Sequence, residues 1–104
     1  RVMTNDLYVK DDIYEYIVNL VEATRTMEIF SMGASPRGTI ALLRMAKAMA
    51  VIDGRDYVCA KDVQDVARDV LGHRVKLSAR GKAQGISMQQ AIGMLVAQVA
   101  APRV

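Results

Sequence analysis

Hydrophobic residues recur at helical spacing in four stretches of the chain, and each stretch has its own start and stop signals. Residues 11–26 open on two acidic side chains, which suit the positive end of a helix. Their apolar stripe consists of Ile13, Ile17, Leu20, Val21 and Thr24. Residues 35–53 start at Ser35-Pro36, a capping residue followed by a proline that needs no amide partner. Gly54 then predicts the end of this second helix.

Two shorter helices are predicted farther along. Residues 61–71 carry an unbroken 3-4-3-4 apolar pattern of Val63, Val66, Ala67, Val70 and Leu71. This helix lacks an obvious cap, because Ala60 stands where an Asp, Ser or Thr would be expected. Residues 87–100 begin with a capping box in which Ser87 caps and Gln90 reaches back, and Pro102 prevents continuation.

The connections are short, and two brief segments, 57–59 and 75–77, can run extended. Residues 27–34 and 78–85 are predicted to be loops. Four helices that are each apolar on one side must bury those stripes against one another. The pattern therefore predicts an all-α domain of four helices with short extended connections.

Composition agrees with a single domain, residues 1–104. Hydrophobic residues make up 52% of the chain and aromatic residues only 5%, which favours helices over an aromatic-rich sheet. No apolar run approaches the roughly 20 residues that cross a bilayer, so no membrane partner is expected. The single cysteine, Cys59, favours a reducing, cytoplasmic setting. Because the chain begins at Arg1, we expect it to be a piece of a longer protein.

Common chemical signatures are missing. The sequence has no Gly-rich phosphate loop ending in Lys-Ser or Lys-Thr, and no His and Cys cluster at metal-ligand spacing, so no metal site is predicted. Cys59 could act as a nucleophile only with His73, the single histidine, beside it. We favour a half-buried structural Cys59, and a His73 that meets the last carbonyls of the preceding helix.

The segment from Gly33 to Thr39 is the best candidate site. Arg37 lies in the first turn of a helix, where exposed amides and the positive helix end already favour an anion. Its guanidinium offers a planar set of donors that suits phosphate oxygens. Glycines on either side, Gly33 and Gly38, would let a ligand approach the backbone. The alternative is that Arg37 pairs with a carboxylate such as Asp56; the residues alone leave these two interpretations even.

A family resemblance favours the first interpretation. The segments that carry it run in order along nearly the whole chain: Asp12 to Arg25, Gly33-Ala34-Ser35-Pro36-Arg37, Ala46-Lys47-Ala48, Gly54-Arg55-Asp56-Tyr57-Val58, Asp62-Val63 and His73-Arg74. This series resembles the C-terminal helical lid of MoxR-type AAA+ ATPases. The departure is again Ala60, which puts the start of the third helix in doubt but not the site.

The resemblance implies a role for each part of the motif. Arg37 matches the sensor-2 arginine, which reaches the terminal phosphates of ATP, and Gly33, Ala34, Ser35 and Pro36 line the same nucleotide-binding site. The Walker motifs, the Mg²⁺ ligands and the arginine finger belong to a preceding core domain, so these 104 residues alone should not hydrolyse ATP. The longer protein would be an ATP hydrolase in a ring-shaped homo-oligomer, a hexamer. It would assist the assembly of metalloenzymes or complexes, often with a von Willebrand factor A domain partner.

Two functions of other classes stay open on the residues alone. The net charge of +3 and the pI near 9.3 permit a small helical DNA-binding module, although no helix begins with the Lys, Arg, Asn and Gln cluster that reads bases. Nucleic acid is therefore not the expected partner. A passive helical adaptor is the other alternative, and it would need an apolar groove that stays open.

Overall fold

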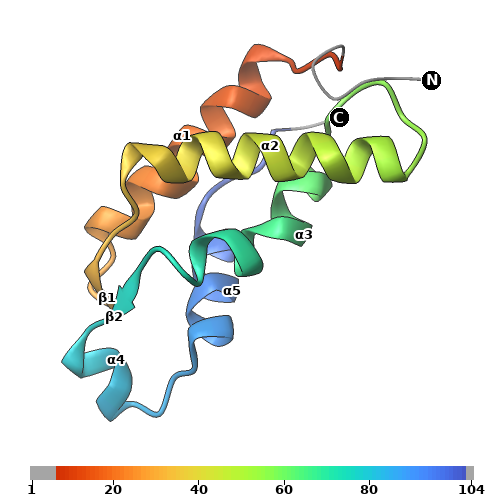
Figure 1. Ribbon diagram of the computed structural model, residues 1–104. Coiled ribbons are helices and arrows are strands. Elements are labelled where there is room, and N and C mark those ends of the chain that lie inside the picture. Colours follow the sequence, from red (N-terminus) through yellow and green to blue (C-terminus); the bar gives the residue numbers. More distant parts are fainter. Residues whose placement is uncertain (1–6, 103–104) are drawn as a thin grey trace.

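The computed structural model describes residues 7–102 as a mostly helical domain with one very small sheet (Figure 1). In chain order the elements are α1 (Asp11–Thr26), β1 (Phe30–Met32), α2 (Pro36–Ile52), α3 (Ala60–Leu71), β2 (Lys76–Leu77), α4 (Ala79–Ala83) and α5 (Met88–Gln98). The four predicted helices correspond to α1, α2, α3 and α5. The last of them ends at Gln98 because Val99 adopts an extended conformation.

The helices bury the predicted stripes in one common core. All five residues of the α1 stripe are buried, together with Tyr16. In α2 the buried side chains include Leu42, Ala46 and Ala50, and the two alanines let α3 approach closely. Figure 1 shows α2 crossing in front of α1, with α3 and α5 below it. Helix α5 closes the core by packing against both α3 and α1.

The four predicted helices are all present, and the described residues form a fifth, short helix that the sequence did not predict. The polar segment 78–85, predicted as a loop, contains the single turn of α4. The Ser78 hydroxyl caps this turn by accepting the Gly81 amide at 3.1 Å. Gly81 is buried against Ile29, so a contact from a distant part of the chain holds the turn in place. A helix of one turn is too short to show an apolar period.

The second loop prediction, for residues 27–34, was also wrong in part. Strand β1 lies within it and pairs antiparallel with β2, with Phe30 opposite Leu77 and an irregularity before Met32. A backbone hydrogen bond from Ser78 to the Ile29 carbonyl, at 2.8 Å, extends this pairing. Near the start of the described chain, Tyr8 forms a parallel bridge with Tyr57.

The start of α3 is better supported than Ala60 suggested. Helix α3 begins at Ala60 with Cys59 as its capping residue, and the Asp62 carboxylate accepts the Cys59 amide hydrogen at 2.9 Å. The predicted capping box of α5 is present, with Ser87 and Gln90 bonded reciprocally at 2.9 and 3.1 Å. None of the helices between residues 7 and 102 combines the length and apolarity that a membrane span requires.

Candidate functional site

The end of α1 fixes the backbone that leads into α2. The buried Thr24 hydroxyl accepts the amide hydrogen of Ala34 at 2.9 Å and donates its own hydrogen to the Val21 carbonyl. Arg25 donates from Nε to the carbonyl oxygen of Ala34 at 3.0 Å. Both backbone groups of Ala34 are therefore satisfied by consecutive side chains of α1. This pairing sets the position at which α2 begins, one residue beyond Ser35.

Gly33 lies directly against the backbone of Arg25. A Cβ atom at this position would come within 2.6 Å of Arg25 Cγ and 2.9 Å of Arg25 Cα. Gly38 is buried and faces Ala34, Leu71 and the aliphatic part of Arg74. Both glycines therefore allow close packing inside the domain, whereas the sequence suggested that they kept the surface low for a ligand.

The first turn of α2 differs from the first turns of the other helices in the described part. Helices α1 and α3 begin with acidic side chains, and α4 and α5 have serine caps. Helix α2 has neither, because Ser35 occupies the capping position without forming a side-chain hydrogen bond. The predicted cap by Ser35 was wrong, although Pro36 is at the first helical position as expected. Within residues 7–102, no acidic side chain of the first turn and no side-chain cap neutralises the positive end of α2.

Arg37 is exposed in this turn. No carboxylate between residues 7 and 102 lies within 4.0 Å of its guanidinium, and no hydrogen bond engages it there. The alternative in which Arg37 pairs with Asp56 is therefore not seen. Asp56 is itself exposed, and its carbonyl accepts a backbone hydrogen bond from Tyr8.

Two adjacent depressions meet at the head of α2. The first, of about 620 Å³, is lined by the predicted residues Gly33, Ala34, Ser35 and Pro36, together with Arg25, His73, Arg74 and Lys76. Arg37 lines the second, with Ile40, Ala41, Arg44 and Met45. Arg74 lines both. Four of the five predicted site residues therefore line the first depression, and the fifth, Arg37, lines the second depression beside it.

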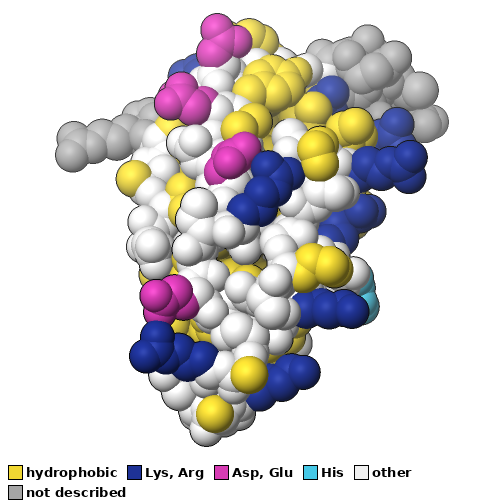
Figure 2. All heavy atoms as spheres, turned by 90° about the vertical axis from the view of Figure 1, so that its left-hand side faces the viewer, with side chains coloured by type: hydrophobic (Ala, Val, Ile, Leu, Met, Phe, Trp, Pro, Cys, Tyr) yellow, Lys and Arg dark blue, Asp and Glu magenta, His cyan; other side chains and the backbone are white. Residues whose placement is uncertain are grey.

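Cations gather around this part of the surface. Figure 2 shows Lys and Arg side chains along one edge of the molecule, with the single histidine among them. Sequence reasoning missed Arg74 and Lys76 as members of the site, because they reach it from the segment after α3. The sequence feature that could have pointed to Arg74 was its place beside His73 in the matched His73-Arg74 segment, directly after Gly72.

The predicted contact of His73 with the last carbonyls of α3 is not present. His73 is exposed and forms no hydrogen bond within the described residues.

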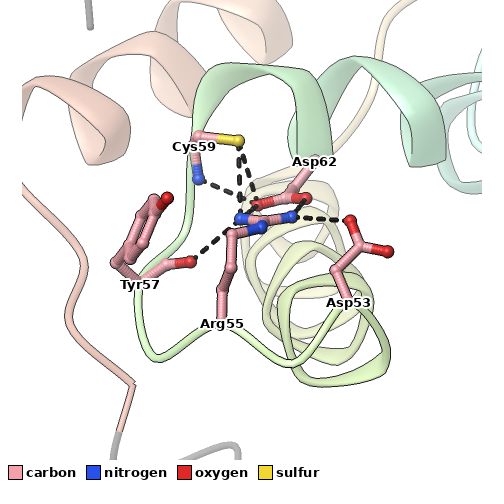
Figure 3. Close-up of polar contacts among 5 residues, drawn as sticks. All are labelled: Asp53, Arg55, Tyr57, Cys59 and Asp62. Atoms are coloured by element: carbon pink, nitrogen blue, oxygen red, sulfur yellow. Dashed lines mark hydrogen bonds and ion pairs between the residues drawn. The ribbon is translucent and has the colours of Figure 1, made fainter.

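A buried ion pair joins the other end of α2 to α3 (Figure 3). Arg55 donates two hydrogen bonds to Asp62, at 2.8 and 2.5 Å, and one to the exposed Asp53 at 2.9 Å. Burial alone would raise the pKa of Asp62. Hydrogen bonds from Arg55 and from the Cys59 amide outweigh it, so the pKa lies below its usual range. The bonds to Asp62 and then Asp53 raise the pKa of Arg55.

Cys59 belongs to this ion-pair network and has no histidine beside it. Its Sγ lies 3.4 Å from Asp62 Oδ2 and 3.5 Å from Arg55 Nη1 (Figure 3). Cys59 and His73 flank opposite ends of the 12-residue α3, which is about 18 Å long at the usual helical rise. They cannot form a nucleophile and base pair. Within the described residues, no group of three or more His, Cys, Asp or Glu side chains is placed to hold a metal ion.

Comparison with known proteins identifies the domain. Residues 22–93 match the AAA lid domain family. Over 92 residues the chain is 39% identical to the uncharacterized protein YeaC of Bacillus subtilis, covering 88% of this chain and 29% of that protein. It is 36% identical over 106 residues to the chaperone MoxR1 of Mycobacterium tuberculosis, covering 93% of this chain and 28% of the relative.

A solved structure has the same fold. The crystal structure of a putative ATPase from Cytophaga hutchinsonii superposes with a TM-score of 0.85 at 35% identity, over 96% of this chain and 33% of that one. The chain thus spans about a third or less of these three proteins. Family match, sequence identity and fold agree, and the chain belongs to the AAA lid domain family as the helical lid of a MoxR-family AAA+ ATPase.

Proposed function

We propose that Arg37 is the sensor-2 arginine of this lid and binds the β- and γ-phosphate region of ATP. The observation that carries the proposal is the exposed Arg37 guanidinium, which has no carboxylate partner among residues 7–102, in a helix turn without acid or side-chain cap. A guanidinium and the leading amides of a helix both favour phosphate oxygens. The two contributions act on the same anion.

The residues before Arg37 form the rest of the lid's contribution. Gly33, Ala34, Ser35 and Pro36 line the neighbouring depression with Arg74 and Lys76. The anchoring of Ala34 by Thr24 and Arg25 supports a preorganised binding surface, since the backbone is held before any ligand arrives. A fixed backbone loses less entropy when the nucleotide binds.

The nucleotide would bind between this lid and the AAA+ core domain of the longer protein. ATP and Mg²⁺ are the cofactors, and the core supplies the Mg²⁺ ligands and the groups that activate water. The lid adds positive charge where negative charge accumulates in the transition state. When the γ-phosphate leaves, the attraction on Arg37 weakens and the lid rotates relative to the core.

We propose the same broad role for the longer protein that the name of MoxR1 states for that relative, a chaperone. It would act as a ring-shaped homo-oligomer, a hexamer, that assists the maturation of metalloenzymes or protein complexes. A von Willebrand factor A domain protein is the expected partner. The setting would be cytoplasmic, because the single Cys59 cannot form a disulfide within this chain.

Substitution of Arg37 in the full-length parent tests the proposal. Arg37→Ala should lower the rate of ATP hydrolysis about 10- to 100-fold, which corresponds to losing a charge-assisted hydrogen bond. Arg37→Lys should be intermediate, because it keeps the charge and loses the planar pair of donors. Lys82→Ala removes an exposed charge from α4 and serves as the control. Unchanged hydrolysis in Arg37→Ala, with the lid still folded, would refute the assignment.

A further inference from the structure

Arg25 lines the candidate site, and the domain itself holds its side chain in place. It lies in the last turn of α1, beside the first depression. Its Nε donates to the Ala34 carbonyl at 3.0 Å, in a partly buried hydrogen bond. Its Nη1 meets Glu22 at 3.3 Å, in an exposed pair that contributes little in water. The bond to Ala34 is therefore the main contact of this guanidinium among residues 7–102.

Gly33 confines the stem of Arg25 from the other side. A Cβ atom at Gly33 would come within 2.6 Å of Arg25 Cγ, so only the bare backbone of a glycine fits there. The side chain thus passes Gly33 and places its Nε on the carbonyl of the next residue. The end of a helix favours a cation without either contact, so the two contacts need a separate reason.

From Ala34 the connection continues into the turn that carries Arg37. Ala34 is 1% exposed, and its methyl group would lie 3.2 Å from a Cβ atom at Gly38, so the two residues pack closely. The Gly38 amide donates to the Ser35 carbonyl at 2.8 Å. Gly38 directly follows Arg37 in the chain. A shift of Ala34 would therefore displace the turn from which the Arg37 side chain extends.

We propose that Arg25 is a positioning residue for ATP hydrolysis. It acts through its Nε–H, which holds the Ala34 carbonyl and thereby the head of α2, and not through its charge. The inference rests on the proposed role of Arg37 at the phosphates. A group that stabilises a transition state must be held within about 0.5 Å of its productive position, so a small displacement of α2 is enough to lower the rate.

Three substitutions separate the hydrogen bond from the charge. Arg25→Gln places its amide nitrogen at the chain position of the arginine Nε, so it keeps a donor there and loses the charge. Arg25→Lys places a methylene group at that position and its ammonium one atom farther, so it keeps the charge and loses that donor. Arg25→Met has neither the donor nor the charge. All three keep the Cβ and Cγ positions beside Gly33.

ATP hydrolysis by the full-length parent tests the proposal. Arg25→Lys and Arg25→Met should lower kcat about 10-fold with a smaller change in KM, because misplacement of Arg37 affects the transition state more than ground-state binding. Arg25→Gln should retain a kcat at least about 3-fold above that of Arg25→Lys. Arg68→Lys, at an exposed position of α3 outside both depressions, is the matched control. If Arg25→Lys is the fastest of the three Arg25 variants, the charge acts and the proposal is overturned.

Melting temperatures distinguish positioning from a bond that only stabilises the fold. All rates are measured well below the lowest melting temperature of the series, so every variant is folded in the assay. The positioning role predicts a lower kcat for Arg25→Lys under these conditions. A variant that melts earlier and yet keeps the kcat of the unsubstituted protein would overturn the proposal.

A double substitution distinguishes failure of this inference from failure of the proposed function. In the Arg37→Ala background, adding Arg25→Lys should lower kcat by less than about 2-fold, because the group that Arg25 positions is already gone. A further loss as large as that caused by Arg25→Lys alone would overturn the positioning role and leave the role of Arg37 intact. If Arg37→Ala alone leaves kcat unchanged, the proposed function fails, and this inference fails with it.

Discussion

Thr24 and Ala34 are joined by a buried hydrogen bond of 2.9 Å, in which the Thr24 hydroxyl accepts the Ala34 amide hydrogen. The bond connects the last turn of α1 to the residue two positions before α2. Arg25 completes the connection through the carbonyl of the same residue. The two hydrogen bonds to Ala34 thus fix the start of α2 and, with it, the position of Arg37. Removing either bond should change both the stability of the fold and the geometry of the candidate site.

Replacing Thr24 by Val should destabilise the fold by about 1–3 kcal/mol, because it leaves the buried Ala34 amide without an acceptor while preserving shape. Denaturant unfolding would measure the change. Thr26→Val is the matched control, since Thr26 also bonds to a carbonyl of its own helix but is exposed. If both variants lose the same free energy of unfolding, the hydrogen bond between Thr24 and Ala34 does not contribute to stability beyond what an exposed threonine does.

Gly33 and Gly93 should respond to alanine in opposite directions. In Gly33→Ala the new methyl group would clash with the Arg25 backbone, so we expect a loss of about 1–3 kcal/mol. In Gly93→Ala it would meet only Arg68 Nη2, at 3.6 Å, at a half-buried position in the middle of α5. Helix propensity then predicts a gain of about 0.5–1 kcal/mol. Thermal unfolding of both variants checks the signs, and stabilisation by Gly33→Ala would contradict the close approach.

Breaking the Arg55–Asp62 pair should be costly, and the cost should depend on which partner is removed. Arg55→Met leaves the carboxylate of Asp62, which is 2% exposed, without its cation, and should cost about 2–4 kcal/mol. Asp62→Asn should cost less, because the remaining Arg55 still contacts Asp53 and is partly exposed. Asp53→Asn removes only the exposed partner and should cost under about 1 kcal/mol. A larger loss from Asp53→Asn than from Arg55→Met would invert this ranking and refute it.

The same pair makes stability depend on pH in the acid range. The pKa of Asp62 is lower in the folded state than its usual value, so the folded state binds this proton less readily than the unfolded chain. Its contribution is therefore complete above the usual pKa of an aspartate and is lost as the pH falls through the lowered value. Urea midpoints measured between neutral and acid pH should fall for the unsubstituted protein. Asp62→Asn should remove part of that decline, and an identical profile would show that Asp62 does not contribute.

Local signals predicted the four longer helices because their causes are local. Acidic first turns, Pro36 at the first position of α2, the Ser87 and Gln90 capping box and Gly54 act within a few residues, and the apolar period spans only a few turns. Gly54 indeed has a positive φ of 75°. The Arg37 position could also be found from sequence, since a cation in a first turn is visible without knowledge of the fold.

Other features depend on distant parts of the chain and were missed or misjudged. The pairing of β1 with β2 joins residues more than 40 positions apart, and α4 is held by Ile29. Ala60 suggested a weak helix start because the sequence does not show that Asp62 bonds to Cys59 and Arg55. The glycines of the site were assigned to ligand access because their packing against Arg25 and Leu71 cannot be read from one segment.

By itself the sequence determined the helical class, the approximate limits of the main helices and the arginine at the head of the second. These features depend on capping hydrogen bonds and apolar periodicity, which involve only residues that are close together in the sequence. Tertiary structure decided the rest. It brought Arg74 and Lys76 beside that helix end, anchored Ala34 to α1 and left Arg37 without a carboxylate among the described residues. The physical reason is that the surroundings of a charged side chain depend on which helices the buried core brings together.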